Sequence, residues 1–267
     1  NDTFTIKDFI AMYDKNRYIE LSSLDKAIID EDYVKKLRRL LGRADRKGKL
    51  KLSFFDLPEV EALLEQQNNL PAFRHHRKIY EGFNTLSSED IPKIKIEGTL
   101  RPYQAEGLKW IKYLYDNNLG GCLADDMGLG KTIQTIAMLS TIYPKAKKPS
   151  LIVMPKSLLF NWRNEFEKFA PQIKIYSYYG ADREIGKINE CNVCLTSYAI
   201  ARNDIELLKD LSFRYIILDE SQNIKNIGSQ TTRGVYLLNG EKRLALSGTP
   251  IENNLSELYS LFHFLNP

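Results

Sequence analysis

Cysteine is scarce in this chain. Three cysteines among 267 residues are an odd number, which argues against a framework of disulfides. Cys191 and Cys194 have the C-x-x-C spacing of a redox pair or of half a zinc site. No second pair of this kind exists, and His75, His76 and His263 lie far away in the sequence. We therefore expect buried strand cysteines rather than a redox or zinc centre.

Long apolar segments are also missing. No run approaches the roughly 20 apolar residues that a membrane-spanning helix needs, and the N-terminus lacks the basic and apolar segments of a signal peptide. We therefore expect an intracellular protein without a membrane partner. The chain begins at Asn1 rather than Met, which favours an excised fragment or a renumbered chain.

The remaining composition is ordinary, but the charge is unevenly placed. Hydrophobic residues make up 43% and charged residues 27%, as in soluble globular proteins, and the length allows one large α/β domain beside a smaller one. The formal net charge is +4, yet residues 35–51 hold nine lysines and arginines against the single acid Asp45. Such a cluster can neutralise nucleic-acid phosphates. Leu37, Leu40 and Leu41 have helical spacing, however, and we favour a solvated helix face.

Residues 1–95 lack a catalytic signature and predict a small α+β module. Short strands are expected over residues 17–21 and 49–52, each followed by a helical pattern such as residues 58–67. The polar stretch 87–92 is the expected linker to the next domain.

From residue 96 the pattern alternates between helices and apolar strands. A helix is expected over residues 102–117, with Leu108, Ile111 and Leu114 on one face. Strands are expected over residues 121–125, 151–155, 173–178, 192–197, 215–219 and 243–247. Continuous apolar runs are typical of a sheet that is covered on both faces. We therefore predict an α/β fold with a doubly wound, mainly parallel sheet that binds ligands at the carboxyl ends of its strands.

A phosphate-binding loop is predicted after the first of these strands. Residues 125–132 read Asp-Asp-Met-Gly-Leu-Gly-Lys-Thr between an apolar strand pattern and a helical one, the order that a P-loop requires. Gly128 and Gly130 permit backbone N–H groups to turn around an anion. Lys131 is expected to reach the β- and γ-phosphates, and the Thr132 hydroxyl to bind Mg²⁺. The first glycine of the strict pattern is replaced by Asp125, and a strand-to-helix turn without a ligand is the alternative.

Two adjacent carboxylates end the strand predicted over residues 215–219. Asp219 is expected to hold Mg²⁺ through water, and Glu220 to orient or deprotonate the attacking water. Two acids at the end of a buried strand are costly without a metal or hydrogen bonds. A plain strand-to-loop junction is the alternative. Because each signal supplies what the other lacks, the loop and the acidic pair together favour a P-loop NTPase.

Further segments resemble, in the same order, the motifs of the SWI/SNF-type ATPases of helicase superfamily two, which translocate on duplex DNA. The matches are residues 100–104 (the adenine-reading motif), 124–132 (motif I), 151–158 with 161–162 and 165–166 (motif Ia), 196–198 (motif Ib), 219–222 with 224–226 (motif II) and 246–250 (motif III). Motif I of the family commonly has aspartate where this chain has Asp125. Ser221 departs from the alanine or glycine that is more usual in motif II.

The resemblance implies a RecA-like P-loop domain over residues 96–267 that binds ATP with Mg²⁺. Gln104 is expected to read the adenine edge, and Gln222 to act in catalysis with Lys131 and Glu220 by coupling the γ-phosphate to motif III. Mg²⁺ is assigned to Thr132 and Asp219. The expected nucleotide contacts of the loop are Asp126, Met127, Gly128, Leu129, Gly130, Lys131 and Thr132. The alternative for Gln104 is a surface helix residue.

The resemblance also implies contact with double-stranded DNA. Lys156, Ser157, Thr196 and Ser197 lie in segments that touch the DNA backbone in the family. Ser247 and Thr249 are expected to relay the nucleotide state to the DNA track. A turn chosen for its glycine and proline is the alternative for residues 247–250.

The family implies a larger machine around this lobe. Residues 264–267 correspond to the place where the first RecA-like lobe passes into the second, which supplies the arginine fingers. We therefore expect these residues alone to bind nucleotide better than they hydrolyse it. DNA-bound proteins are the expected remodelling targets. Residues 1–95 resemble the accessory domain of bacterial members, which favours a cytoplasmic, DNA-associated protein, with a nuclear remodeller as the alternative. A regulatory module that binds nucleotide without turnover and a small-molecule kinase are the competing functions.

Overall fold

The structure is a computed structural model that describes residues 94–267 except 144 and 250–254. In the N-terminal part it describes residues 6–16, 18–20 and 26–28 and the single positions 31, 34, 35, 38, 39, 79, 82 and 86. The chain divides into two compact units, Asn1–Phe83 and Asn84–Pro267, so the boundary predicted at residue 95 falls within the second unit. The strand expected over residues 49–52, the helix over 58–67 and the linker over 87–92 lie outside the described residues.

The described part of the first unit includes helix α1 (Ile6–Asn16), one antiparallel strand pair and several further helical positions. Helix α1 is followed by β1 (Tyr18–Glu20) and β2 (Lys26–Ile28), with Ile19 opposite Ala27. Strand β1 lies where the sequence predicts a strand. Of the basic segment, the structure describes Lys35, Arg38 and Arg39, and Arg38 forms an ion pair with Asp14.

The second unit is built on a six-stranded parallel sheet in the order β3-β10-β8-β4-β6-β5. The strands are β3 (Gly121–Leu123), β4 (Ser150–Met154), β5 (Ile175–Ser177), β6 (Val193–Ser197), β8 (Ile216–Leu218) and β10 (Arg243–Leu246). Five of the six lie within their predicted strand ranges, β4 begins one residue before its predicted range, and the predicted mainly parallel sheet is confirmed. Strands β7 (Ser212–Phe213) and β9 (Asn239–Gly240) form a separate, short parallel pair.

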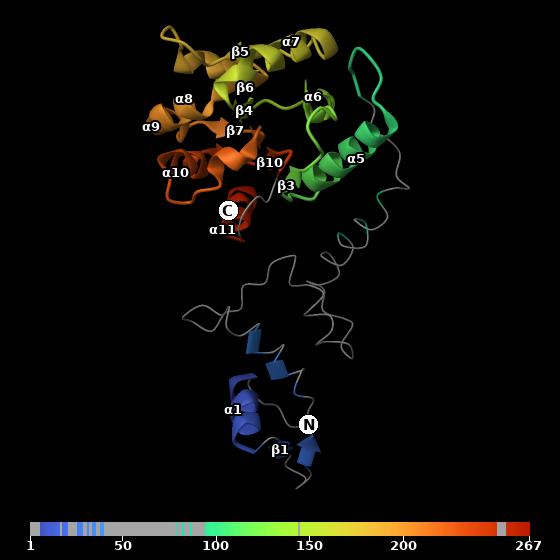
Figure 1. The fold of residues 1–267 in the computed structure, drawn as a ribbon, viewed down its shortest axis with the longest axis vertical. Coiled ribbons are helices and arrows are strands. Elements are labelled where there is room, and N and C mark those ends of the chain that lie inside the picture. The colour runs from blue at the N-terminus through green and yellow to red at the C-terminus, as the bar shows by residue number, and fades with distance from the viewer. Residues whose placement is uncertain are drawn as a thin grey trace. The chain divides into compact units, whose positions relative to one another are not determined.

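Helices cover both faces of this sheet (Figure 1). One apolar core packs α5 (Pro102–Asp116), α6 (Lys131–Ile142) and α7 (Leu159–Phe169) on one face. The other core packs α8 (Tyr198–Asn203), α9 (Ile205–Leu208), α10 (Gln230–Leu237) and α11 (Leu255–Leu265). Successive residues of β4 point into different cores: Ile152 and Met154 lie in the first core, and Leu151 and Val153 lie in the second. The strands therefore need continuous apolar runs, because neither face of the sheet is exposed to solvent.

The cysteines are single thiols. Cys194 lies in β6 and Cys191 two residues before that strand begins, both are buried, and neither forms a disulfide. Burial raises the pKa of Cys191 to about 11, so its thiol stays protonated and unreactive at neutral pH. In the described ranges, His, Cys, Asp and Glu side chains nowhere gather in threes as a metal site. Nor does any described helix have the length and apolar character for a membrane span.

Candidate nucleotide-binding site

The loop between β3 and α6 has the backbone of a phosphate-binding loop. Gly128 and Gly130 have φ angles of 83° and 79°, in the left-handed region that glycine adopts without a Cβ clash. At Gly130 a side chain would also displace the amide of Gln104, because a Cβ would lie 2.5 Å from its Nε2. Helix α6 begins directly afterwards, at Lys131, so its N-terminus and positive dipole end lie at the loop.

Lys131 reaches back over this loop. Its Nζ donates hydrogen bonds to the backbone oxygens of Asp125, at 2.7 Å, and Asp126, at 3.1 Å. Thr132 occupies the next position, in the first turn of α6. Leu129 N donates to the oxygen of Asp126 at 3.4 Å and closes a turn between them. The cation is therefore held at the loop itself, where it can exchange carbonyl acceptors for phosphate oxygens.

Asp125, which replaces the first glycine of the strict P-loop pattern, ties the loop to α6. Its Oδ2 accepts a hydrogen bond of 2.9 Å from Nε2 of Gln134, which is fully buried. Gln134 also packs closely against the neighbouring helix, since a Cβ on Gly107 of α5 would lie 1.9 Å from its Oε1. The sequence analysis missed Gln134. Its signal was a polar residue within the apolar pattern of residues 133–139.

Gln104 fastens the start of α5 to the same loop. Its Oε1 accepts from the backbone N–H of Arg101 at 3.0 Å, and its Nε2 donates to the oxygen of Leu129 at 3.1 Å. The side chain is 7% exposed, so Gln104 is not the surface helix residue of the alternative interpretation. A longer contact of 3.4 Å joins its Nε2 to the hydroxyl of Tyr103, which is 38% exposed.

Asp219 lies at the carboxyl end of β8, two strands away from β3 in the sheet. Each of its carboxylate oxygens accepts one hydrogen bond, Oδ2 from Nε1 of Trp162 at 2.7 Å and Oδ1 from the backbone N–H of Glu220 at 2.9 Å. Burial raises the pKa of Asp219, while these two donors and Lys131 act in the opposite direction. The hydroxyl of Tyr198 holds the backbone oxygen of Asp219 at 2.9 Å.

The sequence analysis missed the role of Trp162 in holding Asp219. Trp162 lies in α7, 57 residues before Asp219, and is fully buried. It belongs to the residues that match motif Ia, so its type was noted, but spacing along the chain does not reveal the partner of an indole N–H. The N–H of a buried tryptophan usually donates to a hydrogen-bond acceptor. For Trp162 this acceptor is the buried carboxylate of Asp219.

Glu220 has a strained backbone, with φ 49° and ψ 57°. A residue with a Cβ pays about 1–2 kcal/mol in this left-handed region, and such strain gathers at functional sites. The strain is held by neighbours: the Glu220 N–H donates to Asp219, and the Glu220 carboxylate accepts from Nε2 of Gln222 at 2.7 Å.

A chain of hydrogen bonds continues from Gln222 to the loop after β10. Ser247 Oγ donates to Oε1 of Gln222 at 3.2 Å and accepts from the backbone N–H of Thr249 at 3.0 Å. The phosphate-binding loop touches the same loop, because a Cβ on Gly248 would lie 3.0 Å from Cγ of Met127. The loops after β3, β8 and β10 therefore meet at one edge of the sheet, as predicted for the carboxyl ends of parallel strands. Pro250 lies outside the described residues.

The four predicted DNA-contacting residues divide into an exposed and a buried pair. Lys156 and Ser157 are exposed in the 3₁₀ helix η3 (Lys156–Leu158), directly after β4. Thr196 and Ser197 end the neighbouring strand β6 and are 0% and 3% exposed. Both hydroxyls are used internally: Thr196 Oγ1 donates to the oxygen of Tyr178 at 2.9 Å, and Ser197 Oγ accepts from the N–H of Ile200 at the start of α8.

A P-loop, an acidic pair and a parallel sheet with helices on both faces define this chain as a P-loop protein with a RecA-like fold. Comparison with known proteins gives the family: residues 103–267 match the model of the SNF2-related domain. Since this match spans more than half of the chain, the chain belongs to the SNF2 family. The predicted family and fold are confirmed.

Individual relatives agree with this assignment. The chain is 36% identical over 263 residues to the putative ATP-dependent helicase/translocase YwqA of Bacillus subtilis, covering 89% of this chain and 28% of that protein. It is 45% identical over 197 residues to Helicase SWR1 of Debaryomyces hansenii, covering 70% and 12%. It is also 41% identical to the Sulfolobus solfataricus SWI2/SNF2 ATPase core, solved in complex with dsDNA, with a TM-score of 0.63 and coverage of 67% and 38%. The chain thus spans a minor part of each of these relatives.

Proposed function

We propose that this chain carries the first ATPase lobe of an ATP-dependent translocase on double-stranded DNA. The observation that carries the proposal is the hydrogen-bond chain from Glu220 through Gln222 and Ser247 to Thr249. It joins the acid expected to act on the attacking water to the loop of motif III. A nucleotide-dependent motor needs such a connection, whereas a module that only stores nucleotide does not. Relatives described as helicases or translocases, and a related ATPase core solved with dsDNA, support the proposal.

ATP binding is assigned to the loop between β3 and α6. Lys131 would exchange its two carbonyl acceptors for oxygens of the β- and γ-phosphates, and the N–H groups at Gly128 and Gly130 would donate to phosphate. For adenine, Gln104 can release the 3.4 Å contact of its Nε2 with Tyr103 and keep the shorter bonds to Arg101 and Leu129. A recognition contact is then added without disturbing the loop.

The residues fit Mg²⁺, which prefers hard oxygen ligands and keeps several waters. The Thr132 hydroxyl and the Asp219 carboxylate supply such oxygens, and each Asp219 oxygen keeps acceptor capacity beyond its one protein hydrogen bond. When bound, Mg²⁺ neutralises charge on the phosphates. The protein's own part is to hold Asp219 in one orientation through Trp162 and to present Glu220 to the water that attacks the γ-phosphate.

DNA contact is assigned to the exposed residues Lys156 and Ser157 after β4. Lys156 offers a cation to a backbone phosphate, and its Nζ lies 5.5 Å from the ring centroid of Tyr179. Thr196 and Ser197, whose side chains are buried, would shape the adjoining segment rather than touch DNA with their hydroxyls. DNA-bound proteins as remodelling targets and a second RecA-like lobe belong to the same proposal.

The test is ATP turnover of the full-length parent protein, with and without duplex DNA, in wild type and in Glu220→Gln. The substitution preserves the shape of the side chain and removes the carboxylate, so nucleotide affinity should persist while most turnover is lost. Wild-type turnover should rise with duplex DNA. Turnover that ignores DNA would favour a nucleotide-binding scaffold or a small-molecule kinase, and a Glu220→Gln variant as active as wild type would remove Glu220 from its role.

A further inference from the structure

A pocket lies at the edge of the sheet opposite to the nucleotide loop. It has a volume of about 390 Å³ and is lined by Lys112, Tyr115, Thr141, Ile142, Lys145, Ala146, Lys147, Lys148, Arg214 and Glu241. Lys148, Arg214 and Glu241 lie two residues before the first residues of β4, β8 and β10, so they mark the amino ends of parallel strands. The residues assigned to the phosphates and Mg²⁺ follow the carboxyl ends of strands, and the two sites share no residue.

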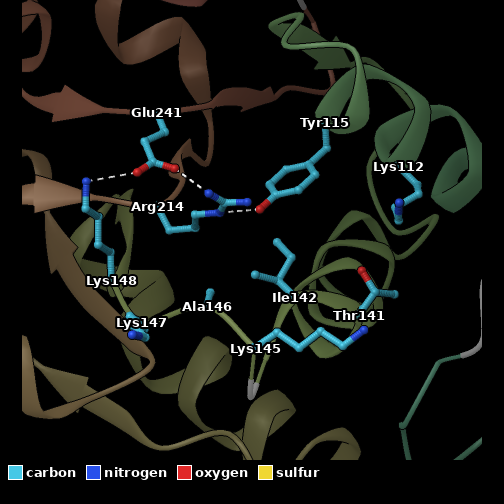
Figure 2. A pocket seen from close by; sticks show the side chains of 10 residues that line it. All are labelled: Lys112, Tyr115, Thr141, Ile142, Lys145, Ala146, Lys147, Lys148, Arg214 and Glu241. Carbon is cyan, nitrogen blue, oxygen red and sulfur yellow. Dashed lines mark hydrogen bonds and ion pairs between the residues drawn. The ribbon is translucent and has the colours of Figure 1, made fainter.

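The lining of this pocket is strongly cationic. Five of its residues are lysine or arginine, and Glu241 is its single carboxylate. Figure 2 shows Arg214 between Glu241 and Tyr115 and joined to both, with Lys148 on the other oxygen of Glu241. Lys148, followed by Arg214, keeps the pKa of Glu241 below its ordinary value. This carboxylate therefore stays ionised, and two cations already share it.

Of the three remaining lysines, Lys145 and Lys147 have positive charge to offer. Lys112 is paired with Asp116, which lies outside the lining. Lys145 and Lys147 are exposed, and within the described part of the chain neither is part of an ion pair. Both follow the end of α6, in the sequence Lys-Ala-Lys-Lys that leads into β4. A cation excess at one concave place attracts a partner of opposite charge.

The floor of the pocket is apolar. Ile142 is 7% exposed, and Ala146 packs against the same core. The surroundings of the Tyr115 ring are crowded, because the Arg214 guanidinium, the Lys242 amine and the Tyr215 ring lie 5.3, 5.1 and 5.4 Å from its centroid. A fitting ligand therefore has an apolar group in its middle and negative charges at its sides.

We propose that this pocket binds an acidic peptide segment of a partner protein, with an apolar side chain on the floor over Ile142 and Ala146 and flanking carboxylates on Lys145 and Lys147. Free phosphate matches the rim but leaves the apolar floor unfilled. Duplex DNA presents its phosphates on a convex surface and has no side chain to enter the pocket. Pockets of a few hundred Å³ that combine apolar walls with a few placed polar groups are suited to binding.

The experiment uses a fluorescein-labelled peptide in which glutamates flank a central pair of leucines. Its binding to the full chain is measured by fluorescence anisotropy. Lys145→Glu with Lys147→Glu should weaken binding by about tenfold, since each reversed rim charge changes affinity by a few-fold. Both side chains are exposed, so the variant should fold, and circular dichroism checks this. The matched control is Lys187→Glu with Lys209→Glu, which makes the same change in net charge outside the pocket and should bind the peptide like wild type.

Two further probes distinguish the proposed ligand from a general anion. A peptide with serines in place of the leucines should bind at least several-fold more weakly, because it leaves the floor unfilled. Equal binding of the serine peptide would overturn the proposal, as would a control variant that loses as much affinity as the pocket variant. A duplex oligonucleotide that competes with the peptide, and loses the same factor in the pocket variant, would reassign the pocket to nucleic acid. No measurable binding of the leucine peptide would also overturn it.

Discussion

The clearest quantitative test of the site is Trp162→Phe, which removes the indole N–H that holds Oδ2 of Asp219 at 2.7 Å. An aromatic ring remains in the core, but one of the two hydrogen bonds that orient the carboxylate is lost. A hydrogen bond to a charged group is worth about 1.5–3 kcal/mol, and loss of a group that orients a metal ligand typically costs about 10–100-fold in metal affinity. We therefore expect the Mg²⁺ concentration for half-maximal nucleotide binding to rise by about 10–100-fold.

The assay is calorimetric titration of the full chain with a nonhydrolysable ATP analogue over a series of Mg²⁺ concentrations. Phe166→Leu is the matched control, because Phe166 lies one turn further along α7, is 1% exposed and has its ring centroid 6.1 Å from that of Trp162. It disturbs the same core without removing a donor from Asp219. Both variants should lose roughly 1–3 kcal/mol of stability, so unfolding curves are compared first. An unchanged Mg²⁺ profile in folded Trp162→Phe, or an equal shift in Phe166→Leu, would refute the reasoning.

Three further outcomes are expected. Lys131→Ala should weaken binding of a nonhydrolysable ATP analogue while the unfolding curve stays near that of wild type, because Lys131 contacts loop carbonyls rather than the core; unchanged affinity would exclude its phosphate role. Asp204→Asn should lower the free energy of unfolding by about 1–3 kcal/mol at pH 7, because the hydrogen bond from Arg183 is lost. This hydrogen bond lowers the pKa of Asp204. The stabilisation is therefore complete above the ordinary carboxyl pKa of about 3.9 and disappears as the pH falls through the lowered pKa. The deficit should therefore shrink in urea titrations below about pH 4, and a deficit that does not depend on pH would contradict the ion pair. Residues 1–267 alone should hydrolyse ATP slowly and with little response to duplex DNA, since transition-state charge needs arginines from a second lobe; strong DNA stimulation in a rigorously purified sample would show that the site is completed in another way, such as self-association.

The pattern of apolar residues predicted the frame of the second unit well. Parallel strands covered on both faces need uninterrupted apolar runs, and those runs marked all six strands to within a few residues. The helix expected over residues 102–117 is α5 (Pro102–Asp116). The order of the motifs then placed the P-loop, the acidic pair and the loop after β10 at one edge of the sheet, because parallel strands share the direction of their carboxyl ends.

What the sequence did not predict are the side-chain partners across the fold. Trp162 and Asp219 meet across 57 residues, and Gln134 joins Asp125 from within an apolar helix. Such pairs depend on the directions of side chains in three dimensions, which periodicity does not encode. Burial at strand ends was likewise hidden: Thr196 and Ser197 look like surface polar residues in the sequence, yet both hydroxyls are used inside the protein.

Strand β3, from which the nucleotide loop extends, is three residues long and lies at the edge of the sheet. In the part of the chain that the structure describes, β10 is its single hydrogen-bonded neighbour in that sheet. A short edge strand opens locally at a lower free energy than a central one, so the amides of β3 should exchange with deuterium faster than those of β8. A nucleotide that binds the closed loop adds its binding free energy to the cost of opening. Protection of the β3 amides against exchange should therefore rise with nucleotide concentration. Exchange at this edge strand then reports the fraction of sites that are occupied by nucleotide.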